Sequence, residues 1–368
     1  MGTVNKLAER VQNRLEEILP QLRKTVTRKL SLAVGAMLEG QTPNTVELSN
    51  LLPLPTERQD MREQWLRRLL KNSLLNCTAV MTPFATRELS KAGQNRQTIL
   101  LCLDQSDLGN RMALLIISVR VGGRALPLAW QAQTGAANLG FEAQKELLEC
   151  VLSWLPTDAE VLLLADRFYP SLGLFEWLHS HGWKYRLRLK GNVLADPGFG
   201  DETTTRDLAR GMTERFLPKV RLFASGVMTN LGILHEAGHL EPWIIAMDCY
   251  PSRAAVIDYR ERWGIEPMFA DFKTRGFELG DSQLRQSDRL ERLVLIMVLS
   301  MYWCVQIGRD DATQNPTPLE KKAHHQTDPK HWIFRKLQRS LVSWFKRGLR
   351  FIMRCLQQNR PVPPFFRC

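Results

Sequence analysis

The stretch that decides the fold is TILLCLDQSDLGNRMALLIISVRVGGRALPLAWQA, which spans residues 98–132. It contains three apolar runs, TILLCLD at 98–104, RMALLIISVRV at 111–121 and RALPLAWQA at 124–132. Short apolar runs bounded by polar or glycine residues predict buried strands. Gly122 and Gly123 separate the last two runs, and a glycine pair favours the tight turn of a β-hairpin. We therefore expect a meander of three strands.

Helix and strand patterns alternate after this meander. The sequence predicts a helix in FEAQKELLECVLSWL (141–155), a buried strand in VLLLAD (161–166), a helix through His179 and a strand in KYRLRLK (184–190). From about residue 191 to 250, the runs RLFASGVMT, LGILH and WIIAMD predict a β-rich insertion. This order predicts an α/β protein whose mixed sheet is covered by helices, and it resembles the ribonuclease-H-like fold.

The first 95 residues predict an all-α domain. KLSLAVGAMLE (29–39) is an apolar-periodic helix that Gly40 interrupts, and TPNTVELSNLLP (42–53) begins a second helix with Thr or Asn as its N-cap. A third helix follows in ERQDMREQWLRRLLKNSLL (57–75). The first two helices and their turn fit a helix-turn-helix and a small helical bundle equally well.

The charge of the chain points to a polyanionic partner. The formal net charge is +12, and residues 321–368 contain 12 Lys and Arg against the single acid Asp328. Such an excess favours nucleic acid as the partner. The basic segment KHWIFRKLQRSLVSWFKRGLRFIMR (330–354) predicts an amphipathic helix, which could contact DNA phosphates, another protein or an anionic membrane.

Cysteine usage and hydropathy bear on the compartment. The seven cysteines form no CxxC pair, which argues against a zinc knuckle and a disulfide framework and favours reduced thiols in a cytosol. The longest apolar run, from Leu293 to Val305, has 13 residues. Since a span needs about 20 apolar residues, we expect a buried helix there rather than a membrane segment.

Two aspartates follow predicted strands. Asp104 ends TILLCLD and Asp166 ends VLLLAD. In open α/β sheets, sites form at the carboxyl ends of strands, so these carboxylates would meet if their strands were neighbours. Carboxylate oxygens are the ligands that Mg²⁺ prefers. Asp107 competes with Asp104, but we expect it to lie beyond the strand.

A second group of polar residues lies in YRERWGIEPMFADFK, residues 259–273. Tyr259, Arg262, Glu266 and Lys273 are spaced Y-x2-R-x3-E-x6-K. In a helix, steps of three, four and seven residues place all four side chains on one face. Glu266 could complete a two-metal site, and the cations suit a phosphate. The alternative is a solvated helix face with an Arg262–Glu266 pair.

With these residues, the chain resembles the DDE transposases of bacterial insertion sequences, in the group with the Tyr-x2-Arg-x3-Glu-x6-Lys (YREK) signature. The resemblance covers nearly the whole chain through LCLDQSD, LLLADRFY and PWIIAMD followed by YRERWGIEPMFADFKTRGFEL. It implies a helical DNA-end-binding domain at 1–95. A ribonuclease-H-like catalytic domain at 96–310 would follow, with its insertion at about 191–250. Residues 311–368 would form a linker and a basic C-terminal helix.

The resemblance also implies the chemistry of the site. Asp104, Asp166 and Glu266 would be the catalytic residues and would hold two Mg²⁺ ions, for which Mn²⁺ can substitute. Water and then a 3′-hydroxyl would attack phosphodiesters, giving DNA cleavage and strand transfer. The local sequence after Asp166 is Arg167, Phe168 and Tyr169, whereas relatives often have a glycine soon after the acid.

The partners of the chain follow from the same resemblance. Tyr259, Arg262 and Lys273 would contact phosphates of double-stranded DNA at the transposon ends, which are terminal inverted repeats. Target DNA would be the second nucleic-acid partner, and a homodimer would form in the synaptic complex. The location would be the bacterial cytoplasm, associated with the nucleoid and without a membrane partner.

Other functions compete with this interpretation. A catalytically silent DNA-binding regulator of transposition would keep the fold without the chemistry, and another ribonuclease-H-like nuclease would cut without joining. The sequence His235-Glu236-Ala237-Gly238-His239 matches the HExxH motif of zinc proteases. Gly238 and the strand-like flanks predict a hairpin turn there instead of a metal-binding helix.

Overall fold

The computed structural model describes residues 2–198, 200, 202–224, 226–236, 238, 240–318 and 343–366. The chain forms two compact units, one comprising Met1–Cys77 with Ala270–Cys368 and the other Thr78–Phe269. These borders group the long apolar helix near residue 300 with the N-terminal helices rather than with the sheet. The functional domain borders at 95 and 310 stay a prediction, because compactness does not test function.

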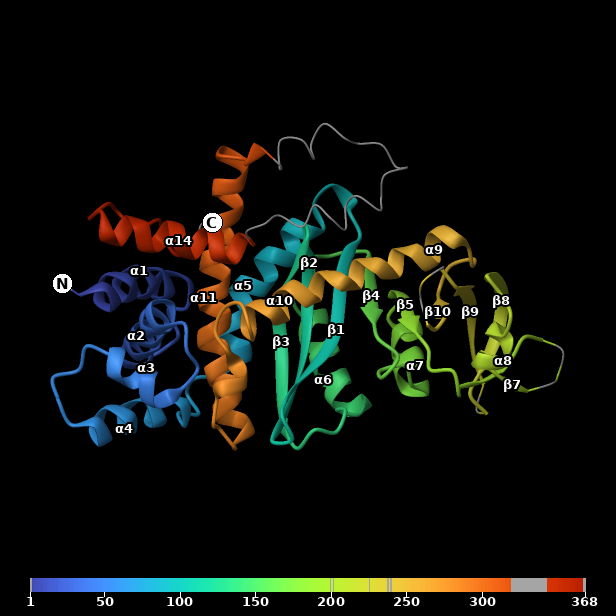
Figure 1. Ribbon diagram of the computed structural model, residues 1–368, viewed down its shortest axis with the longest axis horizontal. Helices are drawn as coiled ribbons and strands as arrows, with labels where there is room; N and C mark the ends of the chain where they lie inside the picture. The colour runs from blue at the N-terminus through green and yellow to red at the C-terminus, as the bar shows by residue number, and fades with distance from the viewer. Residues whose placement is uncertain are drawn as a thin grey trace. The chain divides into compact units, whose positions relative to one another are not determined.

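The unit of residues 78–269 is built on one sheet (Figure 1). Its first five strands are β1 (Ile99–Leu108), β2 (Met112–Val121), β3 (Arg124–Thr134), β4 (Val161–Ala165) and β5 (Lys184–Arg188). β1, β2 and β3 form the expected antiparallel meander, while β1, β4 and β5 are parallel. Val121 pairs with Arg124 around the glycine turn, where Gly122 has a φ of 56°. The α/β, ribonuclease-H-like fold class is confirmed.

The β1 strand is longer than the sequence indicated. Its parallel pairing with β4 ends at Leu103 and Ala165, but its antiparallel pairing with β2 continues to Leu108 and Met112. The expectation that the strand ends at Asp104 is wrong, and Asp107 also lies within it. The physical reason is that β2 supplies backbone partners beyond the point where β4 stops.

The insertion extends the same sheet. It contains β6 (Leu194–Asp196), β7 (Thr203–Thr204), α8 (Thr205–Ala209), β8 (Glu214–Leu222), β9 (Val227–Leu234) and β10 (Trp243–Met247). The strand order in the described residues is β3-β2-β1-β4-β5-β10-β9-β8-β6-β7, with β10 antiparallel to β5. RLFASGVMT is not one strand, because a turn at Phe223–Gly226 divides it between β8 and β9.

Helices complete this unit. They are α5 (Cys77–Ala92), η1 (Gln94–Arg96), α6 (Phe141–Leu152), α7 (Leu172–Ser180), α9 (Arg253–Asp258) and the 3₁₀-helix η2 (Tyr259–Gly264). α6 packs on β2 and β3 and also contacts α7, and η2 packs across β3, β4 and β5. α10 (Ile265–Phe272) follows η2 directly and crosses the border between the two units.

The other unit is helical where it is described. Its N-terminal part contains α1 (Thr3–Ile18), α2 (Lys24–Gly40), α3 (Thr45–Leu51) and α4 (Gln59–Leu70). The helix break comes one residue after Gly40, since Gln41 adopts the left-handed conformation. Asn44 is the N-cap of α3 and accepts a hydrogen bond from N of Val46, so the structure selects Asn from the two predicted residue types. This confirms an all-α N-terminal region, and its DNA binding stays a prediction.

Two further helices and a 3₁₀ turn, η3 (Leu279–Asp281), belong to the helical unit. α11 (Ser287–Gln314) is long and apolar enough to cross a membrane by length and composition, but 83% of its most apolar window is buried, as in a core helix. α14 (Trp344–Gln357) packs its buried face against α11. Residues 319–342 of the expected linker and basic helix lie outside the described residues.

Candidate active site

Asp104 and Asp166 lie at the end of the parallel ladder between β1 and β4. The last pair of this ladder is Leu103 with Ala165, and each aspartate is the next residue of its chain. The two carboxylates are close enough for the charge of Asp166 to act on the pKa of Asp104. The structure therefore brings together the two aspartates that the sequence singled out, because their strands are parallel neighbours.

The backbone and a tyrosine hold the two carboxylates in place. Oδ1 of Asp104 accepts hydrogen bonds from N of Gln105 at 2.9 Å and from the hydroxyl of Tyr169 at 3.2 Å. Oδ1 of Asp166 accepts one from N of Arg167 at 2.7 Å. Tyr169 follows Asp166 by three residues and reaches back to Asp104. The sequence interpretation missed this contact and noted the tyrosine only as part of a local departure.

The Tyr-Arg-Glu-Lys run does not form one helix. Tyr259 and Arg262 lie in the 3₁₀-helix η2, Glu266 lies in α10, and Lys273 follows the end of α10. The prediction that all four side chains share a helix face is therefore wrong, because a 3₁₀-helix has three residues per turn rather than 3.6. Residues three apart superimpose in a 3₁₀-helix, so Tyr259 and Arg262 lie on the same side.

Tyr259 and Arg262 both contact the aspartates. Nη1 of Arg262 donates to Oδ2 of Asp104 at 2.8 Å, and the hydroxyl of Tyr259 donates to Oδ1 of Asp166 at 3.3 Å. The guanidinium carbon of Arg262 lies 5.7 Å from the centre of the Tyr259 ring. Nε of Arg262 is buried and has no hydrogen-bond partner among the described residues. Tyr259 and Arg262 thus each contact one of the two aspartates.

Burial controls the electrostatics of this group. It raises the pKa of Asp104 above its ordinary value, which Arg262 opposes and the charge of Asp166 reinforces. Burial also raises the pKa of Tyr259 and of Tyr169, and for Tyr169 the charge of Asp104 adds to the increase. Both phenols therefore remain protonated at neutral pH and act as hydrogen-bond donors.

The insertion supports Tyr259 from the other side. Tyr259 is 1% exposed. The centre of its ring lies 5.5 Å from the ring centre of Trp243, and the two rings are edge-on. Trp243 is also buried and packs edge-on against Trp263 at 5.6 Å. The apolar cluster around these rings comprises Leu234, Trp243, Ile245, Met247, Ala255, Val256 and Tyr259. The insertion therefore supplies part of the packing that fixes Tyr259 beside the aspartates.

Glu266 follows the 3₁₀-helix η2 in the chain. It is an exposed residue in the first turn of α10. Across the part of the chain that the structure describes, no group of three or more His, Cys, Asp or Glu side chains is placed to hold a metal ion. The aspartate pair fits part of a divalent-cation site, since such ions prefer carboxylate oxygens. The structure does not gather the third predicted ligand into that pair.

Lys273 belongs to the helical unit. It follows Phe272, the last residue of α10, and the border between the units precedes Ala270. Its assignment as a phosphate-binding residue stays a prediction.

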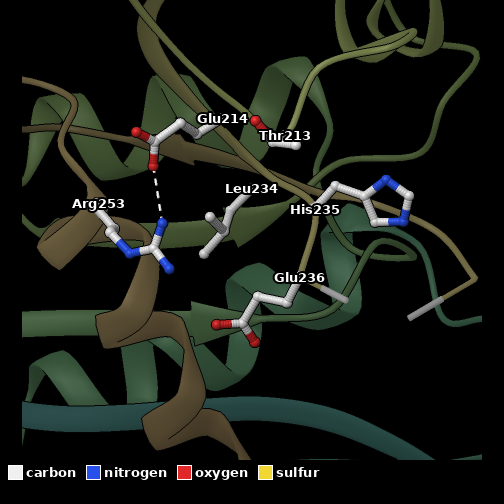
Figure 2. Close-up of a pocket in the computed structure, with 6 residues that line it drawn as sticks. All are labelled: Thr213, Glu214, Leu234, His235, Glu236 and Arg253. Atoms are coloured by element: carbon white, nitrogen blue, oxygen red, sulfur yellow. Dashed lines mark hydrogen bonds and ion pairs between the residues drawn. The ribbon is translucent and has the colours of Figure 1, made fainter. Parts of the chain in front are cut away.

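Residues of the insertion and Arg253 of α9 line a polar pocket of about 500 Å³. Its lining residues are Thr213, Glu214, Leu234, His235, Glu236 and Arg253. Figure 2 shows Arg253 facing Glu214, to which it is paired at 2.9 Å, with the His235 imidazole pointing away from that pair. His235 and Glu236, the first two residues of the HExxH match, follow the end of β9 in its connection to β10. Ala237 and His239 lie outside the described residues, and the described part of the motif is not helical.

Residues 141–303 match the family model described as the transposase DDE domain. The matched range contains Asp166, the η2 residues Tyr259 and Arg262, and Glu266, and it begins after Asp104. No curated protein matches the chain. The match thus covers one of the two aspartates and both signature residues that contact the pair.

Proposed function

We propose that this chain is a DDE transposase, which cuts DNA at the ends of its own mobile element and joins those ends to a target; the match of residues 141–303 to the transposase DDE domain supports this. The observation that carries the proposal is the pairing of Asp104 and Asp166 at the end of neighbouring parallel strands. Tyr259 and Arg262 contact this pair at hydrogen-bond distance. We also propose that the chain belongs to the group of the family that carries the Tyr-x2-Arg-x3-Glu-x6-Lys (YREK) signature.

The proposed ligands of two Mg²⁺ or Mn²⁺ ions are Asp104, Asp166 and Glu266. Bound ions would make a water molecule more acidic and would neutralise charge on the oxygens of the scissile phosphodiester. The reaction has two steps, in which water attacks the phosphodiester at the element end and the 3′-hydroxyl so released attacks the target. Glu266 is exposed on α10 and would be the third carboxylate of the site.

The cations of the signature would bind DNA phosphates. Arg262 suits this role, because its planar guanidinium presents five N–H donors and only Nη1 is used on Asp104. The buried Tyr259 hydroxyl stays protonated and orients Asp166. Lys273 would add a point charge to the phosphate contacts. DNA would thus be held beside the carboxylates that act on it.

Recognition of the DNA ends is assigned to the helical N-terminal region. A homodimer would bring two ends together, and both the terminal inverted repeats and a target duplex would be substrates. The net charge of +12 supports a nucleic-acid partner. The bacterial cytoplasm, at the nucleoid, would be the site of action.

The test is a cleavage and strand-transfer assay with DNA that carries the element's own ends, in Mg²⁺ or in EDTA. We expect cutting and joining in Mg²⁺, loss of both in EDTA, and loss of both in Glu266→Gln with end binding retained. Glu142→Gln is the matched control, since Glu142 is also an exposed glutamate in the first turn of a helix of the sheet unit. It should cut like the wild type.

The outcomes separate the competing functions. Binding of the ends without cutting by any variant would favour a regulator that lacks catalysis. Metal-dependent cutting without joining would favour another ribonuclease-H-like nuclease. Full activity of Glu266→Gln would remove Glu266 from the catalytic set while leaving the aspartate pair.

A further inference from the structure

Five consecutive residues contact five different strands or strand ends of the sheet. Asp258 pairs with Arg186 of β5, Tyr259 with Asp166 after β4, Arg260 with Glu236 after β9, Glu261 with Arg120 of β2, and Arg262 with Asp104 of β1. A 3₁₀-helix turns by a third of a circle per residue, so successive side chains leave η2 in three directions. The segment therefore crosses the face of the sheet and is fixed to it residue by residue.

We propose that Arg120 and Glu261 are positioning residues, which hold η2 so that Arg262 and Tyr259 meet the two aspartates. The proposal rests on the proposed transposase function for its catalytic consequence. Neither residue contacts Asp104 or Asp166 in the contacts of the described structure. Their effect on catalysis would pass through Arg262, which follows Glu261 directly.

The burial and the hydrogen bond of Arg120 hold its guanidinium against Glu261. Nη2 of Arg120 donates to Oε2 of Glu261 at 2.9 Å, and the Arg120 side chain is 14% exposed. Nε and Nη1 of Arg120 are buried and have no hydrogen-bond partner among the described residues. Removing the one carboxylate would thus leave a buried cation without compensation, which is strongly unfavourable.

The backbone of η2 is shaped around the Arg120 guanidinium. A Cβ added at Gly264 would lie 2.1 Å from Nη1 of Arg120, far inside van der Waals contact. Gly264 therefore permits the close approach of the guanidinium to the end of η2. Because the guanidinium is held by Glu261 at the same time, the contact links the middle and the end of η2 to strand β2.

The neighbouring contacts explain why this pair controls Arg262. Arg260 binds both carboxylate oxygens of Glu236 and lies 5.5 Å from the ring centre of Trp243. That contact fixes the side of η2 that faces the insertion. The Glu261 contact with β2 fixes η2 in a second direction, at the residue adjacent to Arg262. Loss of it would loosen the backbone of η2 directly beside the residue that reaches Asp104.

The first test needs no DNA. Hydrogen exchange of the backbone amides of residues 259–264 would be compared in wild type, Arg120→Gln and Glu261→Gln. We expect exchange to be about tenfold faster in both variants, because local opening of η2 becomes easier. Glu160→Gln is the control, since it breaks an ion pair at the amino ends of β4 and β5. In that pair, Nζ of Lys184 lies 2.6 Å from Oε2 of Glu160. It should leave these amides unchanged.

The second test asks whether Arg120 acts through Arg262. In the cleavage assay, Arg120→Gln should lower the turnover rate about 10–100-fold with DNA-end affinity retained, as for groups that orient a site. The double variant Arg120→Gln with Arg262→Gln should lose no more activity than Arg262→Gln alone, because a shared role gives non-additive losses. Losses that multiply would overturn the proposal.

The two proposals fail in different ways. If the wild type cuts no DNA, the proposed function fails and hydrogen exchange still tests the positioning role. If the wild type cuts and Arg120→Gln exchanges and cuts like it, the positioning role is wrong and the function stands. Should Arg120→Gln not fold, Glu261→Gln carries both tests, since its side chain is 46% exposed and its removal leaves no buried cavity.

Discussion

Two ion pairs each join a cation to a carboxylate at one end of the parallel strands, and they differ in their surroundings. Arg262 and Asp104 meet at 2.8 Å beside the aspartate pair, and their side chains are 11% and 21% exposed. Lys184 and Glu160 meet at 2.6 Å at the amino ends of β5 and β4, and their side chains are 45% and 55% exposed. The shorter distance belongs to the more exposed pair, so separation alone does not rank them.

The pKa directions show what burial adds. At Asp104, burial raises the pKa and outweighs the opposing charge of Arg262. At Glu160, the hydrogen bond from Lys184 lowers the pKa and outweighs the small effect of burial. A carboxylate in a partly buried site is thus held in a less stable charged form, while the exposed one is simply paired in water. The carboxylate after β1 is therefore in a buried environment, and the carboxylate before β4 is at the exposed surface.

The largest expected effect comes from Asp166. Asp166→Asn keeps the size of the side chain and removes the carboxylate, so we expect cutting to fall by about 10³-fold or more. DNA-end binding should be retained. Single-turnover cleavage measures the loss, and Glu160→Gln, at the opposite end of the same strand, should cut normally. A variant at Asp166 that cuts normally would break the contrast between the two ends.

A smaller effect is expected on stability. Arg262→Gln leaves the partly buried Asp104 without its cation, and we expect the free energy of unfolding to fall by about 3 kcal/mol at neutral pH. Lys184→Gln should lower the unfolding midpoint much less than Arg262→Gln does, because solvent already screens that exposed pair. Urea unfolding of both variants would give the comparison. Equal losses would show that burial does not distinguish the two pairs.

The pH dependence is the smallest effect and has opposite signs at the two ends. The folded protein holds the Asp104 proton more tightly than the unfolded chain does, because the folded pKa is raised above 3.8. The stability due to Asp104 is thus present below this value and is lost as pH rises through the folded pKa. Glu160 has a folded pKa below 4.5, so its contribution is present above 4.5 and lost as pH falls.

Unfolding measured against pH, with Asp104→Asn and Glu160→Gln subtracted from wild type, would separate these two contributions. The Asp104 difference should decrease with rising pH from about pH 4 upward, and the Glu160 difference should decrease as pH falls below about 4.5. If both stability differences changed with pH in the same direction, the pKa shift of Asp104 or of Glu160 would have the wrong sign.

The local sequence pattern was enough to predict the strands and most of the residues around the aspartate pair. The apolar runs ending near Asp104 and Asp166 predicted buried strands, because burial on both faces demands continuous hydrophobic residues, and the structure shows that the two strands are neighbours. The spacing of Tyr259 and Arg262 identified two side chains that both contact the aspartate pair. It gave the wrong reason, since a three-residue step superimposes side chains in a 3₁₀-helix and only approximately in an α-helix.

The sequence by itself determined the α/β class, the antiparallel meander, the β-rich insertion and the two aspartates, because periodicity and glycine turns are local properties. Only the tertiary structure decided that the insertion continues the same sheet, that Tyr169 reaches Asp104, and that Arg120 pairs with Glu261. These contacts join residues far apart in the chain, and no local pattern encodes which buried charge meets which partner. The packing of η2 across the sheet determines these pairings, because a charged group that is removed from water needs an oppositely charged partner at a fixed position.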